Sequence, residues 1–155
     1  MPMLRLPPAT LGRTLAVQQQ VQSRLRGGGE HSAEVLLEVD SKRLQMALLT
    51  MGQIIVRLNW DGQRLIEERS AWAPAALSVD RILSDLQFAL WPLTAVQAAL
   101  SLPWAAEGTS TERLLRYGIR PVMYLRTLSA EIIEIDNVLQ GYTLTIRTLS
   151  ELAPT

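Results

Sequence analysis

The strongest constraint on the fold is the alternation of apolar and polar residues along 35–60. A period of two is typical of β-strands that bury one face, and the short polar segments between the runs predict antiparallel hairpins. A turn at Ser41-Lys42 places Leu37 opposite Met46, so that both apolar side chains lie on the same face. Three consecutive strands are therefore expected, within 35–39, 44–48 and 54–60.

The next hairpin is predicted from Asp61-Gly62, a pair typical of a two-residue type I′ turn. A two-residue loop there pairs Leu58 with Leu65 and continues the same apolar face. An earlier strand is predicted at Leu11–Arg26, and it ends in the turn Gly27-Gly28-Gly29. The first half of the chain thus gives about five strands in hairpin connection.

The other face of these strands is less polar than a solvated sheet requires. Five apolar residues lie on it beside charged ones: Leu36, Ala47, Leu49, Ile55 and Ile66. Two interpretations stay open. Either a second layer covers this face in part, or the sheet is curved and has an apolar concave face.

The period changes to that of a helix after Ser78, which is placed to cap it. Five apolar residues recur at intervals of three and four and predict one buried stripe: Val79, Ile82, Leu83, Leu86 and Leu90. The polar residues between them are expected on the exposed side: Asp80, Arg81, Ser84, Asp85 and Gln87. Pro92 ends this helix or begins a second one, which is predicted at 94–102.

Alternation returns after Gly108, where about four further strands are predicted, at 114–117, 122–128, 131–135 and 142–149. The order of strands, helices and strands predicts an α+β fold with helices packed on one side of a single antiparallel sheet. The 155 residues, 48% hydrophobic and 19% charged, suffice for one compact core. We therefore expect one domain, 1–155.

Composition argues against most enzyme classes. Without cysteine, the chain has no disulfide framework, Cys-type zinc site or catalytic thiol, and His31, its one histidine, leaves little for a metal site. Basic and acidic residues number 15 each, so no basic surface for nucleic acid is expected. No G-x-S-x-G motif is present. We therefore expect no catalytic residues, no metal and no cofactor.

The other residues that could form a functional site are apolar, and they include four tryptophans near turns and helix ends. The ordinary interpretation of these residues is a packed core. The alternative is a half-barrel whose two helices plug a cavity for a lipid or another hydrophobe.

Four stretches carry a family resemblance. The turn Thr50-Met51-Gly52 and the strand that follows are similar to the Pro-Leu-Gly turn and strand of LolB, the outer-membrane lipoprotein receptor. The hairpin pair Asp61-Gly62, the helix Leu83–Pro92 (L-x-D-L-Q-x-A-L-W-P) and the strand Gly141–Ile146 (G-Y-x-L-T-I) resemble a LolB-like family more closely. Its members are bacterial lipoproteins often encoded in aryl polyene pigment gene clusters. The likeness covers residues 14–149.

The resemblance implies an unclosed antiparallel β-barrel of about nine to eleven strands under a short helical lid, LolA/LolB-like. It implies a non-enzymatic protein that binds or transfers an acylated lipoprotein or an aryl polyene lipid. Met51 holds the place of the apolar loop residue that touches the membrane in that family; the alternative is an ordinary turn residue packed against a neighbour. Nine residues are expected to face the ligand: Leu37, Met46, Leu48, Val56, Leu58, Trp60, Leu83, Leu86 and Leu90.

The resemblance also implies partners and a location. The partners are a lipid or acylated ligand, the membrane surface and a periplasmic carrier protein, with no nucleic acid. The location is the periplasm, with an outer-membrane anchor through an N-terminal lipid in the native form, although the family's acylated cysteine is absent from this chain. Two other classes stay open: an assembly protein that binds a partner protein in an aryl polyene biosynthesis complex, and an esterase or thioesterase acting on the lipid-linked polyene.

Overall fold

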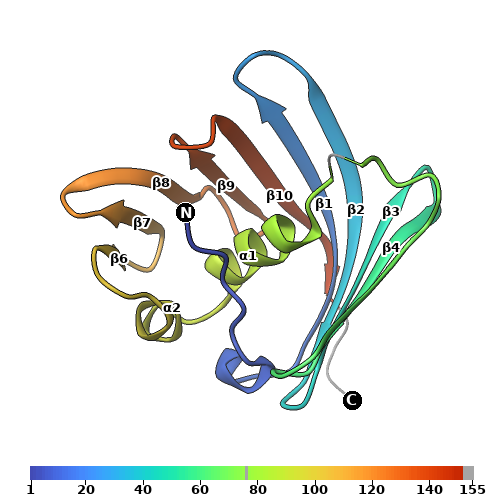
Figure 1. Ribbon diagram of the computed structural model, residues 1–155, viewed down its shortest axis with the longest axis horizontal. Coiled ribbons are helices and arrows are strands. Elements are labelled where there is room, and N and C mark those ends of the chain that lie inside the picture. Colours follow the sequence, from blue (N-terminus) through green and yellow to red (C-terminus); the bar gives the residue numbers. More distant parts are fainter. Residues whose placement is uncertain (76, 152–155) are drawn as a thin grey trace.

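The computed structural model describes residues 1–75 and 77–151 (Figure 1). Ten antiparallel strands form one sheet in the order β5-β4-β3-β2-β1-β10-β9-β8-β7-β6. The first five are β1 (Leu15–Leu25), β2 (Glu30–Val39), β3 (Leu44–Thr50), β4 (Gln53–Trp60) and β5 (Leu65–Arg69). The last five are β6 (Trp104–Gly108), β7 (Glu112–Tyr117), β8 (Arg120–Thr127), β9 (Ile132–Asn137) and β10 (Tyr142–Glu151).

The sheet curls into a half-barrel that does not close. β1 and β10 pair at its centre, while β5 and β6 form its two edges and pair only with β4 and β7 respectively in the described part of the chain. The two helices, α1 (Val79–Leu90) and α2 (Leu93–Ala99), lie on the concave side. The predicted α+β class, the unclosed antiparallel sheet and its short helical lid are confirmed.

Strand pairing agrees with the predicted register in one hairpin and differs in the next. Leu37 lies opposite Met46, as expected. Leu58, however, lies opposite Glu67 and not Leu65, because the β4–β5 loop has four residues, 61–64. The Asp61 carboxylate accepts hydrogen bonds from the backbone N–H groups of residues 63 and 64, and this turn replaces the predicted type I′ geometry.

Three further boundaries differ from the sequence prediction. The first strand begins at Leu15, because the proline-rich segment before it forms a 3₁₀ helix, η1 (Pro8–Leu11), that ends at Gly12 with φ 78°. His31 lies in β2 and not in a loop. Five strands follow the helices where about four are expected, and the additional one is the short edge strand β6. An edge strand of five residues gives little alternation to detect.

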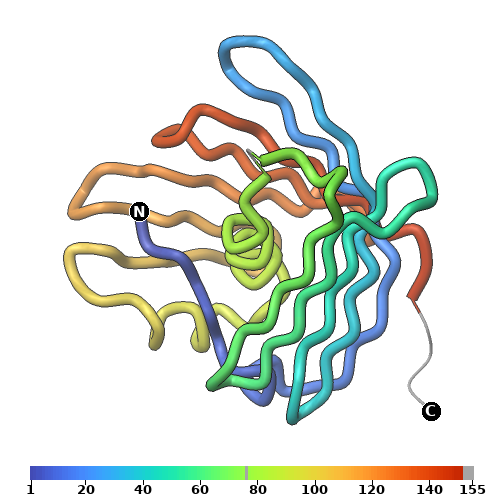
Figure 2. Tube along the Cα trace, turned by 45° about the vertical axis from the view of Figure 1, so that its right-hand side comes forward, coloured from blue at the N-terminus to red at the C-terminus, as the bar shows by residue number. Residues whose placement is uncertain are grey.

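The concave face is covered by α1 and by the first residues of the chain. The N-terminal strap, residues 1–7, runs past α1 across the mouth of the half-barrel (Figures 1 and 2). Its side chains Leu4 and Leu6 are buried in the main hydrophobic cluster. The core is therefore built from the inner face of the sheet, α1 and the strap.

Candidate functional site

The structure brings the nine predicted ligand-facing residues together inside the half-barrel. Six come from the inner faces of β2, β3 and β4 and are buried: Leu37, Met46, Leu48, Val56, Leu58 and Trp60. Leu83 and Leu86 of α1 are buried in the same cluster, and Leu90 packs against it. The helix begins at the predicted residue, where the Ser78 hydroxyl accepts a hydrogen bond from the Arg81 N–H. Sheet and helix thus present one continuous apolar surface.

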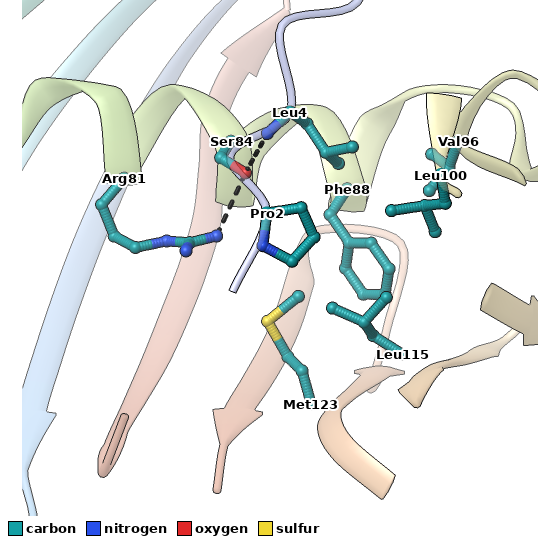
Figure 3. Close-up of a pocket in the computed structure, with 9 residues that line it drawn as sticks. All are labelled: Pro2, Leu4, Arg81, Ser84, Phe88, Val96, Leu100, Leu115 and Met123. Atoms are coloured by element: carbon teal, nitrogen blue, oxygen red, sulfur yellow. Dashed lines mark hydrogen bonds between the residues drawn. The ribbon is translucent and has the colours of Figure 1, made fainter. Parts of the chain in front are cut away.

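Eight of the nine predicted residues have almost no solvent-accessible surface in the conformation described. The cavity beside the strap has a volume of about 10 Å³, enough for about one water molecule. Figure 3 shows it between the strap, α1 and the strands on the far side of the barrel, and none of the nine predicted residues lines it. Its lining residues are Pro2, Leu4, Arg81, Ser84, Phe88, Val96, Leu100, Leu115 and Met123. An apolar ligand of useful size therefore requires the strap or α1 to move.

The strap is held by side chains of α1 and the barrel wall. The Ser84 hydroxyl accepts from the Leu4 N–H at 2.8 Å. The Gln87 amide accepts from the Leu6 N–H at 2.9 Å and donates to the Leu6 carbonyl at 3.1 Å. The Trp60 indole N–H donates to the same carbonyl at 2.9 Å. These bonds satisfy buried backbone groups of an extended segment that has no strand neighbour.

The sequence prediction for the polar side of α1 is wrong. Ser84, Asp85 and Gln87 are buried, not exposed. The strap covers Ser84 and Gln87, whereas Asp85 faces Tyr142 of β10. The strap residues that bond to Ser84 and Gln87 are 80 and 81 residues away in sequence, so the helix pattern alone carries no sign of them. The alternation Leu4-Arg5-Leu6 is the signal that could have shown a half-buried extended segment.

A buried polar cluster ties α1 to β9 and β10. The Asp85 carboxylate pairs with Arg81 at 3.1 Å and accepts a hydrogen bond from the Tyr142 hydroxyl at 2.6 Å. Burial raises the pKa of the Asp85 carboxyl above its ordinary value, although Arg81 and Tyr142 act in the opposite direction. Burial and the neighbouring carboxylate both raise the pKa of Tyr142. The cluster is a polar clasp between helix and sheet.

Met51 lies at the tip of the β3–β4 hairpin and is 97% exposed. Its φ is 53° and that of Gly52 is 76°, so both central residues of this two-residue turn have positive φ. The side chain does not pack against a neighbour, and the alternative of a covered turn residue is wrong. An apolar tip in solvent is the arrangement that the membrane-contact hypothesis requires.

The convex face of β2–β5 is open. A shallow hollow of about 520 Å³ lies over it, and Leu36 and Ile66 are exposed there. No described element covers this face, since α1, α2 and the strap all lie on the concave side (Figure 2). The interpretation of a covering layer is therefore wrong for this part of the chain. The sheet is curved, as the other interpretation held, but its apolar concave face is the one that bears Leu37, and Leu36 and Ile66 lie on the convex face.

Two other features bear on chemistry. Across residues 1–75 and 77–151, no three His, Asp or Glu side chains gather in a way that would hold a metal ion. The helices in the same ranges are too short or too polar for any of them to cross a bilayer.

Comparison with known proteins gives one family and a structural likeness. The model of a family described as protein of unknown function, DUF3261, matches residues 16–150. No curated protein matches the chain. A LolA superfamily protein from Nitrosomonas europaea is similar in structure, with a TM-score of 0.48, 8% sequence identity and coverage of 98% of this chain and 95% of that one.

Proposed function

The chain belongs to the DUF3261 family of proteins of unknown function, and we propose that it binds lipid-like hydrophobic ligands and catalyses no reaction. One observation carries the proposal. The inner face of the sheet is apolar, and the two elements that cover it, α1 and the strap, belong to no strand ladder. An apolar ligand that displaced them would meet the face formed by Leu37, Met46 and Leu58.

Entry of a ligand exchanges one set of apolar contacts for another. An acyl chain that takes the place of Leu4 and Leu6 keeps the barrel wall out of water, so little hydrophobic stabilisation is lost. The cost lies in the hydrogen bonds that Ser84, Gln87 and Trp60 make to the strap. Each such bond contributes about 1 kcal/mol net, and the displaced strap can bond to water instead. The strap is thus an element that can open at moderate cost.

We propose an acylated lipoprotein or an aryl polyene lipid as the ligand, in line with the LolB-like motifs of the sequence. The same resemblance supports a place in the periplasm or at the outer membrane, an N-terminal lipid anchor in the native form, and a periplasmic carrier protein as a partner. The exposed Met51 at a hairpin tip supports contact with a membrane surface.

The test is displacement of an apolar fluorescent probe from the purified protein. Saturable uptake, with displacement by an acylated lipoprotein peptide or by extracted aryl polyene lipid, is the expected result, and the stronger competitor identifies the ligand class. The matching unacylated peptide is the control. Failure of the folded protein to take up probe, in the wild type and in a variant with a weakened strap, would contradict the proposal.

A second candidate function rests on the convex face. The hollow over β2–β5 exposes Leu36 and Ile66 beside Arg57 and Glu68, a mixture of apolar and charged side chains that suits a protein partner in an assembly. This function predicts a stable complex that Leu36→Ser with Ile66→Ser weakens, together with no uptake of probe. Uptake that is unchanged in this double variant favours the lipid-binding function.

A further inference from the structure

The two rims of the half-barrel differ in chemistry. The antiparallel connections place four turns at one rim (Figure 1). These are the β1–β2, β3–β4, β7–β8 and β9–β10 turns. The linker after β5 lies at the same rim, because the Ser70 N–H bonds to the Ile55 carbonyl near the β3–β4 tip. The linker before β6 lies there too, because the Gly118 N–H of the β7–β8 turn bonds to the Pro103 carbonyl.

Large apolar side chains stand exposed along this rim, which we call the apolar rim. Met51 and Ile119 are each 97% exposed, Leu102 is 87% exposed and Trp72 is 72% exposed, and Leu139 is exposed as well. Arg26 is the one charged residue in the sequence of the connecting segments, which contain no Asp or Glu: 26–29, 51–52, 70–78, 100–103, 118–119 and 138–141. Solvent-exposed turns ordinarily carry polar residues, so this composition needs an explanation.

The opposite rim supplies the contrast within the same molecule. Its β2–β3 and β4–β5 turns are closed by Asp40 and Asp61, whose carboxylates accept backbone hydrogen bonds. Its turn segments carry charged residues of both signs: Asp40, Lys42, Arg43, Asp61, Arg64 and Glu131. Leu128 is its exposed large apolar turn residue. The turns of the opposite rim are therefore polar, as is usual for turns in solvent, whereas those of the apolar rim are not.

We propose that the apolar rim is a lipid-contacting surface, along which both halves of the barrel touch the membrane. The inference rests on the proposed function and goes beyond its single contact at Met51. Apolar tips gain free energy by leaving water for the acyl boundary, and Trp72 suits the interface with its amphipathic ring. The connecting segments of this rim contain no carboxylate, and Glu30, which flanks the β1–β2 turn, is paired with Arg24 at 3.2 Å. Repulsion from anionic lipid and the cost of desolvating carboxylates are therefore small.

The inner lid begins at this same rim. Helix α1 starts at Val79, directly after the linker that bears Trp72. The first strap residue lies there as well, since the Asn137 amide at the end of β9 is 3.5 Å from the Met1 sulfur. Lipid contact along the apolar rim would therefore place the membrane next to the beginnings of both covering elements.

Binding of the full chain to zwitterionic phosphatidylcholine vesicles, measured by co-sedimentation, tests the proposal. The decisive variant is Ile119→Ser with Leu139→Ser, far along the sheet order from Met51. We expect it to bind about tenfold more weakly, because two apolar side chains lose their transfer into lipid. Leu128→Ser on the opposite rim is the matched control, and its vesicle binding should be unchanged. Binding that is insensitive to salt is expected, since the contact is apolar.

Tryptophan fluorescence gives a second readout, which does not depend on the Ile119 and Leu139 substitutions. Trp60 and Trp91 are buried, Trp104 at the start of β6 is half-buried against Tyr117, and Trp72 is exposed on the apolar rim. Brominated lipid should therefore quench the wild type, and Trp72→Phe should lose most of that quenching, with Trp104 accounting for the remainder.

Three outcomes would overturn the proposal. The first is no vesicle binding, which would leave the rim as a surface for a protein. The second is a loss confined to Met51 variants, which would reduce the contact to one hairpin. The third is an equal loss in the Leu128→Ser control. Probe uptake into the barrel interior is measured without vesicles, so a failure of the rim proposal is distinguishable from a failure of the lipid-binding function.

Discussion

The Tyr142 hydroxyl donates a 2.6 Å hydrogen bond to the Asp85 carboxylate and so joins β10 to the lid helix α1. The two residues are 57 positions apart in sequence, and Asp85 is almost completely inaccessible to solvent. The Asn137 amide donates in turn to the Tyr142 hydroxyl at 3.2 Å. The pair therefore holds the middle of α1 against the sheet.

Removing this clasp should destabilise the protein. Tyr142→Phe leaves the ring in place but deprives the buried Asp85 carboxylate of a donor, so we expect the free energy of unfolding to fall by about 1–3 kcal/mol. Urea unfolding measures the change. Tyr124→Phe is the control, because Tyr124 is exposed and should change the free energy of unfolding by less than about 0.5 kcal/mol. An equal effect of both substitutions would contradict the clasp.

Asp85 should make stability fall as the pH rises. Burial raises the pKa of its carboxyl above the ordinary value of 3.8, so the folded protein holds this proton more tightly than the unfolded chain does. Stability from this group is therefore fully present below the unfolded pKa and is lost as the pH rises through the folded pKa. The measurement compares wild type with Asp85→Asn by chemical denaturation at a series of pH values.

In that comparison the other carboxyl groups cancel. The free energy of unfolding of the wild type minus that of Asp85→Asn should decrease from about pH 4 upwards. A difference that grows with pH would mean that the ion pair with Arg81 outweighs burial and lowers the pKa of Asp85.

The strap should be loosened by Gln87→Leu. This substitution leaves the Leu6 N–H without its acceptor, at a cost of about 1–3 kcal/mol, and it should raise the rate of uptake of an apolar probe. Gln97→Leu is a matched control, because the Gln97 amide donates to the Ala106 carbonyl at 2.9 Å, away from the strap. It should reduce stability without faster uptake. Equal acceleration by both would show that general destabilisation, not strap release, admits the probe.

Met51 should matter for vesicle binding and not for folding. Asn tolerates the left-handed backbone that Met51 adopts, so Met51→Asn should leave the free energy of unfolding unchanged within about 0.5 kcal/mol while vesicle binding weakens several-fold. Thermal unfolding and co-sedimentation check the two parts separately. Unchanged vesicle binding would remove Met51 from the lipid contact.

The sheet and α1 were predictable because their signals are local. Alternation paired Leu37 with Met46, and the intervals of three and four found the buried stripe that includes Leu83 and Leu86. The covering of the other side of α1 was not predictable in this way. It depends on a contact between Leu6 and Gln87. The periodicity of the helix shows which residues are apolar and which are polar, but not which distant segment packs against the polar ones.

Loop geometry limited the prediction elsewhere. At Asp61 the side chain closes a four-residue turn with its own carboxylate, and this shifted the pairing of Leu58 by two residues. The residues of the apolar rim are spread over six segments, and only the strand order shows that Met51 and Ile119 lie at the same end of the barrel. The strand topology places these residues at one rim, and no single stretch of sequence predicts this.

The pairing of β1 with β10 at the centre of the sheet has a consequence for the ribosome-bound chain. Gln19 of β1 and Thr148 of β10 interact across a separation of 129 residues. During translation, β1 therefore leaves the ribosome long before β10 has been synthesised. During synthesis, the meander β1–β5 can assemble alone, but it keeps an unpaired edge along β1 until the last strand arrives. Closing so long a loop is slow, and an uncovered strand invites pairing with other chains. We therefore expect a chaperone to bind the nascent chain before β10 leaves the ribosomal exit tunnel.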